Sequence, residues 1–248
     1  MGGSAPRWSV VIPAFNEAAR LPGYLKDIQA YFEGRDEGYE VIVVDDGSRD
    51  GTAERVHEIA AGRACVAVHA LGRNRGKGYA VRVGMARARG RLRLMADADG
   101  ATPIGEVARL EVAIEAGADI AVGSRVLRDP AVARQVRLHR KLSGCVFNFL
   151  VRRLGVAGVV DTQCGFKLFR GPVAEVLFPL VVTEGFGFDV ELLMLAERRG
   201  YRVTEVPVNW ADQPGSKVGV LRDGPRMLRE VLAARRRLAR AARAGGRP

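Results

Sequence analysis

Short runs of apolar residues recur along the first half of the chain, and each is followed by polar residues. The run at residues 40–45 reads Glu-Val-Ile-Val-Val-Asp, and similar runs occupy residues 8–14, 65–70, 91–96 and 118–123. Runs without polar alternation are typical of strands that are buried on both faces of a sheet. The pattern therefore predicts a sheet in the interior of the protein.

Helical spacing of apolar residues fills the segments between these runs. We expect helices over residues 18–32, 52–61, 78–89 and 103–116. Strands that alternate with helices are joined by right-handed parallel crossovers. The sequence thus predicts an α/β fold with a mostly parallel sheet flanked by helices, in which ligands bind outside the carboxyl ends of the strands.

Two carboxylates, Asp97 and Asp99, stand at one of these strand ends, after the run at residues 91–96. Side chains two apart on an extended backbone point the same way, so both can meet one hard cation. Mg²⁺ uses few protein carboxylates and completes its coordination with water and substrate phosphates. The motif therefore indicates a metal with a nucleotide diphosphate, although turns and helix caps use the same pattern.

Length and composition fit one domain without a membrane span. The chain has 248 residues, 48% of them hydrophobic, which is enough to bury a complete core. Its cysteines, Cys65, Cys145 and Cys164, lack metal-site spacing, and we expect reduced thiols that pack in the protein. No run reaches the roughly 20 apolar residues needed to cross a bilayer, and no apolar signal segment stands at the N-terminus.

Most of the positive charge lies in a C-terminal tail. The net charge is +11, and residues 226–248 hold eight arginines and one glutamate, which leaves +7 there and +4 elsewhere. Residues 227–235 have helical spacing with apolar residues on one side, as in helices that lie on anionic lipid. A solvated arginine-rich tail has the same composition. Nucleic acid is a weaker candidate, because no aromatic residues are interleaved.

A second amphipathic region lies at residues 132–160. Basic residues come first, and two apolar stretches follow, separated by Arg152 and Arg153. This pattern favours an interfacial helical hairpin that would give the active site a cationic entrance, with a core helix as the alternative. We therefore divide the chain into one domain over residues 1–225, which includes this insertion, and a basic helical tail over residues 226–248.

Other motifs for nucleotide or metal binding are incomplete. Residues 72–78 resemble a phosphate-binding loop, but the spacing is one residue short and no Ser or Thr follows Lys77. The histidines show no metal-ligand spacing, and no nucleophile elbow is present. Arg73 and Lys77 remain as cations that face a nucleotide or its phosphates, with packing at a helix N-terminus as the plain alternative.

Seven motifs in combination resemble one enzyme family. They are Pro-Ala-Phe-Asn-Glu at 13–17, Val-Asp-Asp-Gly-Ser at 44–48, Asn-Arg-Gly-Lys-Gly at 74–78, Asp-Ala-Asp-Gly at 97–100, Gly-Ser-Arg at 123–125, Asp-Thr-Gln-Cys-Gly-Phe-Lys at 161–167 and Gly-Ser-Lys at 215–217. Together they resemble the inverting family 2 glycosyltransferases, whose GT-A fold is a Rossmann-like domain that binds nucleotide sugars. Within that family the chain looks most like the dolichyl-phosphate or polyprenyl-phosphate β-glucosyltransferases.

The resemblance implies a donor site with a metal. The residues that would form the uridine pocket and hold the uridine are Pro13, Ala14, Glu17 and Asp46. Asp97 would face the diphosphate and the metal, which would be Mg²⁺ or Mn²⁺, and Asp99 would bind that metal directly. Gln163 would border the donor sugar or the metal shell.

The resemblance also implies an acceptor site built from cations. Arg125, Arg140 and Lys217 would bind the acceptor phosphate or the leaving diphosphate, and Arg125 and Lys217 would act in catalysis with the two carboxylates. Arg137 and Lys141 are alternatives to Arg140, because that segment has no fixed spacing. By this resemblance the insertion at residues 132–160 would lie on the acceptor side of the site and face the membrane.

A lipid phosphate needs little activation as a nucleophile. Its second ionisation lies near pH 6, so at pH 7 it already carries an anionic oxygen. The site must then align the two phosphates and stabilise the leaving diphosphate. Loose candidates for a base of the kind that hydroxyl acceptors require are Asp161, Asp189 and Glu191, and helix capping is the alternative interpretation of Asp189.

The main prediction is transfer of glucose from UDP-glucose to a dolichyl or polyprenyl phosphate, with inversion. We expect a peripheral protein at the cytoplasmic face of the membrane, bound through its basic segments or through a separate membrane subunit. The alternatives are a mannosyltransferase that uses GDP-mannose and a sugar nucleotidyltransferase that releases pyrophosphate. A nucleic-acid-binding module would retain DNA in a salt-dependent way after mutation of Asp97 and Asp99, and we expect no such binding.

Overall fold

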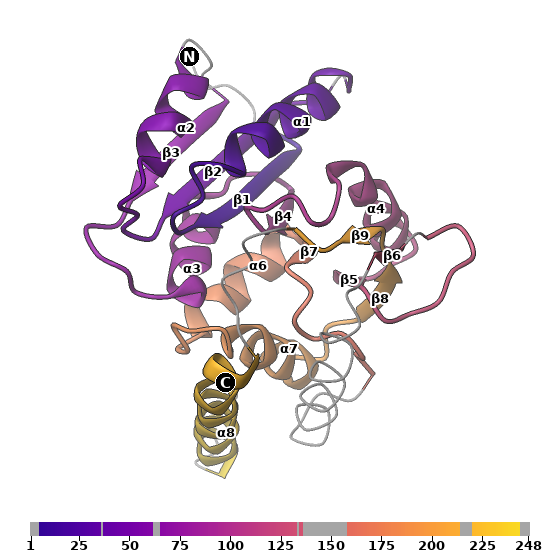
Figure 1. Cartoon of the computed structure of the whole chain (residues 1–248). Helices are drawn as coiled ribbons and strands as arrows, with labels where there is room; N and C mark the ends of the chain where they lie inside the picture. The colour runs from indigo at the N-terminus through magenta and orange to yellow at the C-terminus, as the bar shows by residue number, and fades with distance from the viewer. Residues whose placement is uncertain are drawn as a thin grey trace.

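A seven-stranded sheet forms the centre of the protein, with strand order β3-β2-β1-β4-β7-β5-β8 (Figure 1). The computed structural model describes residues 5–35, 37–61, 65–132, 134–135, 158–213 and 220–243. The strands of the sheet are β1 (Trp8–Ala14), β2 (Tyr39–Asp45), β3 (Val66–Ala70), β4 (Leu92–Ala96), β5 (Ile120–Ser124), β7 (Phe166–Arg170) and β8 (Val203–Pro207). The five strands expected from the apolar runs are all present.

Helices pack on both faces of this sheet. They are α1 (Leu21–Glu33), α2 (Thr52–Ala60), α3 (Lys77–Arg87), α4 (Val107–Glu115), α6 (Gly171–Leu177), α7 (Phe188–Arg198) and α8 (Val220–Arg243), with 3-10 turns η1 (Ile104–Glu106) and η2 (Phe178–Leu180). The four helices expected between the strands are confirmed, with ends shifted by a few residues. The first begins at Leu21 instead of residue 18, after a turn in which the N–H groups of Arg20 and Leu21 donate to the Glu17 carbonyl.

The sheet is mostly parallel, as predicted, with one reversed strand. β1 pairs in parallel with β2 and β4, and β5 pairs in parallel with β8. β7 lies between β4 and β5 and runs antiparallel to both. The apolar pattern did not predict β7, because the charged side chain of Lys167 interrupts it. Lys167 is fully buried in the fold and forms an ion pair with Asp189, a partner that only the tertiary structure supplies.

Alternating residues of the strands fill two separate cores. Val11 of β1 belongs to the core under α3, α6, α7 and α8, whereas Val10 and Ile12 belong to the core under α1, α2 and α4. Both sets of side chains are fully buried, because successive residues of a strand point to opposite faces. The apolar runs without alternation in the sequence follow from this three-layer arrangement.

The apolar side of the C-terminal helix is packed against the protein. Met227, Val231, Ala234 and Leu238 of α8 are at most 6% exposed, and α8 contacts α7 (Figure 1). The helix also starts before residue 226, since α8 spans Val220–Arg243. The expectation that the apolar face of this helix lies on lipid is therefore wrong for these four side chains, because α7 and the adjoining core already cover them.

The acceptor-side insertion lies mostly outside the described residues. Of residues 132–160, residues 133 and 136–157 are not described. Within the rest, β6 (Arg134–Gln135) pairs in parallel with β9 (Trp210–Ala211) as a separate two-stranded sheet. No helix in the described part of the chain is long and apolar enough to cross a membrane.

Candidate active site at the carboxyl edge of the sheet

The two carboxylates of the Asp-Ala-Asp motif follow β4 at the carboxyl edge of the sheet. Ala98 between them is 5% exposed, and Gly100 closes the turn with φ +65°. Asp99 Oδ1 accepts the N–H of Ala101 at 3.0 Å. The turn interpretation of this motif is therefore correct for one oxygen of Asp99, whereas the Asp97 side chain has a different partner.

Lys77 binds Asp97, as its Nζ lies 2.6 Å from Asp97 Oδ1. Lys77 is the first residue of α3, and Gly76 before it has φ +107°. Burial would raise the pKa of Asp97, but the charges of Lys77, Lys167 and Arg125 hold this pKa below its usual value. The structure thus brings one of the two cations from the phosphate-loop motif directly to the carboxylate pair.

Asp99 has the opposite electrostatic character. Burial and the negative charge of Asp97 raise the pKa of Asp99, even though Arg20 and Lys77 act against this. Arg20 lies near this carboxylate, with its Nη1 3.9 Å from Asp99 Oδ2. A second positive charge at this position would relieve the repulsion between the two carboxylates.

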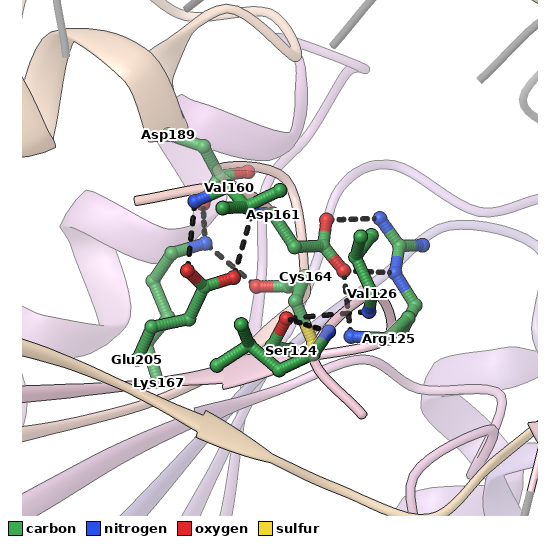
Figure 2. A network of polar contacts seen from close by, with 10 residues as sticks. Ser124, Arg125, Val126, Val160, Asp161, Cys164, Lys167, Asp189 and Glu205 are labelled. Carbon is green, nitrogen blue, oxygen red and sulfur yellow. Dashed lines mark hydrogen bonds and ion pairs between the residues drawn. The ribbon is translucent and has the colours of Figure 1, made fainter. Parts of the chain in front are cut away.

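Arg125 stands at the end of β5 and is held by a buried carboxylate. Its Nε and Nη2 donate to Asp161 at 2.7 Å each, and its backbone N–H donates to the same carboxylate at 2.9 Å (Figure 2). Burial would raise the pKa of Asp161, whose side chain is fully buried, but Arg125 lowers it below its usual value. The guanidinium also lies 5.7 Å from the centre of the Trp210 ring. These contacts fix the position of the cation.

Asp97 and Arg125 line one small hollow. Its other lining residues are Tyr24, Ala101, Thr102, Gly165, Phe166 and Trp210. Within it, Gly165 lies so close to Asp97 that a Cβ atom on Gly165 would come within 3.0 Å of both carboxylate oxygens. Two segments far apart in the sequence, at residues 97–102 and 161–166, therefore meet at the acidic motif.

A buried ion pair supports this second segment, and the sequence did not reveal it. Lys167 Nζ binds the Asp189 carboxylate and donates to the carbonyl of Cys164 at 2.6 Å (Figure 2). The two side chains are at most 3% exposed. Asp189, a loose candidate for a base, is thus the buried partner of a lysine. The residue before α7 is Gly187, so Asp189 lies inside the helix and is not its N-cap. The sequence signal was available, since a charged residue inside an apolar strand needs a buried partner.

Glu205 of β8 is a further residue that sequence reasoning missed. Its two carboxylate oxygens accept the N–H groups of Val160 and Asp161 at 2.7 and 2.8 Å (Figure 2). The backbone of Asp161 is therefore fixed, and with it the carboxylate that holds Arg125. No local pattern marks Glu205, because its partners lie 45 and 44 residues away in the chain.

The residues expected around the uridine gather at the ends of β1 and β2. Pro13 and Ala14 close β1, which pairs with the end of β2. Glu17 accepts two bonds from Arg20, at 2.7 and 2.6 Å. The Asp46 carboxylate accepts the N–H groups of Arg75 and Gly76 at 2.7 and 2.8 Å. Asp46 thus also ties the loop before α3 to this strand end.

Four predicted site residues remain, and the structure describes two of them, Arg73 and Gln163. Arg73 has an exposed side chain, and its backbone packs on Gly47, whose φ of +74° and close neighbours leave no room for a side chain. Gln163 is half-buried in the segment that precedes Gly165. Arg140 and Lys217 lie outside the described residues.

The carboxylate pair fits a divalent cation that takes further ligands from a substrate. Among the described residues, no group of three or more His, Cys, Asp or Glu side chains is placed to hold a metal. Asp97 and Asp99 are two hard oxygen donors whose charges repel, as the raised pKa of Asp99 indicates. Mg²⁺ commonly binds one or two carboxylates together with substrate phosphates and water. The donor set present here therefore suits a metal bound with a diphosphate.

Comparison with known proteins agrees with this geometry. The family model described as "Glycosyl transferase family 2" matches residues 9–178. A protein of Drosophila melanogaster named dolichyl-phosphate beta-glucosyltransferase is 44% identical over 224 residues, which cover 85% of this chain and 68% of the relative. Proteins of the same name from Homo sapiens and Saccharomyces cerevisiae are 40% and 35% identical, over 85% and 92% of this chain and 69% and 73% of theirs.

Solved structures share the fold at lower sequence identity. Glucosyl-3-phosphoglycerate synthase from Mycobacterium tuberculosis, crystallised with Mn²⁺, UDP and its product, superposes with a TM-score of 0.69 at 21% identity, over 96% of this chain and 80% of that one. Mannosyl-3-phosphoglycerate synthase from Rubrobacter xylanophilus gives 0.68 at 22%, over 96% and 76%. The predicted GT-A fold is confirmed. The chain belongs to glycosyl transferase family 2.

Proposed function

We propose that this chain transfers glucose from UDP-glucose to the phosphate of dolichol or another polyprenol, with inversion, to give a lipid-phosphate β-glucose. The observation that carries the proposal is the position of two cations beside the carboxylate pair. Lys77 binds Asp97, and Arg125 shares a hollow with it. Relatives with 35–44% identity are named for glucosyl transfer to dolichyl phosphate, which supports this choice of substrates.

In the proposed donor site, the uridine lies at the ends of β1 and β2. Pro13, Ala14, Glu17 and Asp46 border it there, while Arg73 and Lys77 face the phosphates. The contact between Lys77 and Asp97 supports this division, since it puts a cation where a diphosphate and its metal would meet. When a diphosphate binds together with its metal, Lys77 can pair with the phosphate and Asp97 with the metal. Neither side chain is then left with an uncompensated charge.

Asp97, Asp99 and Gln163 would hold Mg²⁺ or Mn²⁺. The cation, when bound, neutralises negative charge on the leaving diphosphate. The electrostatics of the carboxylate pair support this assignment, because burial and the charge of Asp97 together raise the pKa of Asp99. Solved neighbours of the same fold were crystallised with Mn²⁺ or Mg²⁺ and UDP.

In the proposed acceptor site, Arg125 positions the lipid phosphate, together with Arg140 and Lys217. An oxygen of the acceptor phosphate forms a bond to the anomeric carbon, and the bond from that carbon to the diphosphate of UDP breaks. No proton has to leave the nucleophile, because a phosphate monoester is largely dianionic at pH 7. The cations offset the repulsion between the two phosphate groups. The fixed geometry of Arg125 on Asp161 supports its part in this alignment.

The outer side of α8 offers a surface for anionic lipid. Except for Arg235, which lies at the flank, its exposed arginines share one side of the helix, opposite the four buried apolar residues, as the spacing of 3.6 residues per turn requires. They are Arg226, Arg229, Arg236, Arg240 and Arg243. We therefore propose peripheral contact with the cytoplasmic face of the membrane through charge, at about 1 kcal/mol for each arginine near the surface. Apolar insertion of this helix is not part of the proposal.

A product assay tests the proposed reaction. The full chain is incubated with UDP-glucose, GDP-mannose or UDP-N-acetylglucosamine and a short-chain polyprenyl phosphate, with Mg²⁺, Mn²⁺ or a chelator, and products are identified by mass spectrometry and by NMR of the anomeric proton. 3-Phosphoglycerate is the control acceptor, because the solved neighbours are named for that substrate. We expect lipid-linked β-glucose and UDP. Release of pyrophosphate, or transfer to 3-phosphoglycerate alone, would refute the proposal.

A further inference from the structure

The segment at residues 182–187 is held from one side by the C-terminal helix. Glu230 Oε2 of α8 accepts the N–H of Gly187 at 2.9 Å. Gly185 lies against the same carboxylate, and a Cβ atom there would come within 3.0 Å of it. About two turns further along α8, Arg237 Nη2 donates to Thr183 Oγ1 at 3.0 Å. Two polar residues of α8 thus hold the two ends of this segment.

A buried carboxylate reinforces the Arg237 contact. Glu191 is 1% exposed, and its Oε2 accepts the N–H groups of Val182 and Thr183 at 3.1 and 2.7 Å. Its Oε1 accepts a bond from Arg237 at 2.8 Å. A buried carboxylate without a cation would be costly, so Arg237 also compensates the charge that orders the start of the segment.

The other side of the segment touches the loop before α3 and the first turn of this helix, where Lys77 lies. The Glu184 carbonyl accepts the N–H of Tyr79 at 3.2 Å, and the Glu184 carboxylate forms an ion pair with Arg75 at 2.5 Å. Gly76 and Gly78 pack directly on the backbone of the segment, since a Cβ atom on either would come within 3.0 Å of the carbonyl oxygen of Glu184 or Thr183. The residues on both sides of Lys77 therefore rest on residues 183–184.

These contacts form a continuous path from α8 to the carboxylate pair. Apolar packing attaches α8 to the core but has no direction of its own, whereas hydrogen bonds to backbone N–H groups fix where a segment lies. The position of residues 182–187 sets the position of the loop before α3. That loop places the Lys77 ammonium 2.6 Å from Asp97.

We propose that α8 is a positioning element of the active site: Glu230 and Arg237 fix residues 182–187, and this segment holds Lys77 in place for the donor diphosphate. The proposal rests on the proposed function for the role of Lys77. It assigns α8 a task beyond membrane contact. Glu230 and Arg237 do not touch the substrates in this proposal, so they act only through the segment and the loop that it supports.

Glu230→Ala in the full chain tests the proposal, with Arg226→Ala as the matched control. Arg226 forms an exposed ion pair with Glu230 at 3.1 Å, so the control removes this surface contact but keeps the bond to Gly187. Glu230→Gln keeps an acceptor for that N–H and should rescue. A second approach is Gly185→Ala, whose added Cβ displaces the Glu230 carboxylate from the other side.

Two readouts separate positioning from general stability. Hydrogen exchange of the amides at residues 75–79, without nucleotide, should become faster in Glu230→Ala and Gly185→Ala and stay unchanged in Arg226→Ala and Glu230→Gln. Calorimetric affinity for UDP with Mg²⁺ should fall about tenfold in the first two variants, the factor expected when a partly buried N–H loses its acceptor. In a Lys77→Ala background, Glu230→Ala should cause no further loss of UDP affinity.

Two outcomes would overturn the proposal, and a third would overturn only the proposed function. Unchanged hydrogen exchange at residues 75–79 in both Glu230→Ala and Gly185→Ala would show that α8 does not fix the position of the loop before α3. An equal loss of UDP affinity with and without Lys77 would show that Glu230 does not act through Lys77. If the wild-type chain binds no UDP but exchange responds as expected, the proposed function fails while the coupling between α8 and the loop stands.

Discussion

Replacing Gly165 by alanine should inactivate the enzyme through Asp97. The added Cβ atom would come within 3.0 Å of the Asp97 carboxylate, closer than Cβ atoms lie to other heavy atoms in proteins. Gly165 has no positive φ, so alanine is compatible with its backbone. The Asp97 side chain has to move, because its end is the flexible partner in this contact and is 40% exposed.

The size of the effect follows from this displacement. Restoring an ordinary contact moves the carboxylate by about 1 Å, which breaks its 2.6 Å contact with Lys77 and shifts the proposed metal ligand. A misplacement of about 1 Å in a catalytic group can cost about 100-fold in rate, or about 2.7 kcal/mol in the barrier. Stability should change by about 1 kcal/mol at most, since the loss of a glycine from the unfolded chain is itself stabilising.

The assay compares kcat/KM for UDP-glucose and a short-chain polyprenyl phosphate with the denaturation midpoint in urea. Gly23→Ala in α1 is the matched control, because no atom lies within 4 Å of its Cβ position. We expect about 100-fold lower kcat/KM for Gly165→Ala, and full activity for Gly23→Ala. Activity within threefold of wild type for Gly165→Ala would refute the reasoning, as would a loss of activity that merely follows unfolding.

Three further predictions use other parts of the molecule. Asp99→Asn should raise the activation barrier by several kcal/mol, and so lower kcat, at unchanged thermal stability. Turnover near the wild-type level in the presence of a chelator would exclude the metal assignment. Burial and the charge of Asp161 raise the pKa of Cys164 to about 12, whereas the unfolded thiol ionises near pH 8.5. The free energy of unfolding should therefore fall by up to about 1.4 kcal/mol per pH unit between about pH 9 and 10, and urea titrations should find this slope smaller in Cys164→Ala. Deletion of residues 226–248 should destabilise the fold by about 5 kcal/mol, because it removes four buried apolar residues, and a truncated chain with wild-type stability would contradict the packing of α8.

Local patterns in the sequence were sufficient for the elements that carry the proposed donor site. Strands buried on both faces leave continuous apolar runs, and for this reason β1 to β5 and α1 to α4 were predictable from spacing alone. The acidic motif was placed correctly at the end of β4, since ligands of parallel sheets bind at that edge. Lys77 and Asp97 were both candidates from the sequence, but their contact was not.

The pairing of charges was decided only by the tertiary structure. Lys167 looks unfavourable inside a strand until Asp189 is brought to it across the fold, and Glu205 has no visible role until β8 places it on the backbone of Asp161. The same holds for α8, where periodicity revealed an apolar side but not what covers it. Spacing along a chain reports local geometry, whereas ion pairs and covered faces depend on which distant segments meet. The sequence determined the family and the edge of the sheet that bears the site, and the packing of distant segments determined which charges meet there.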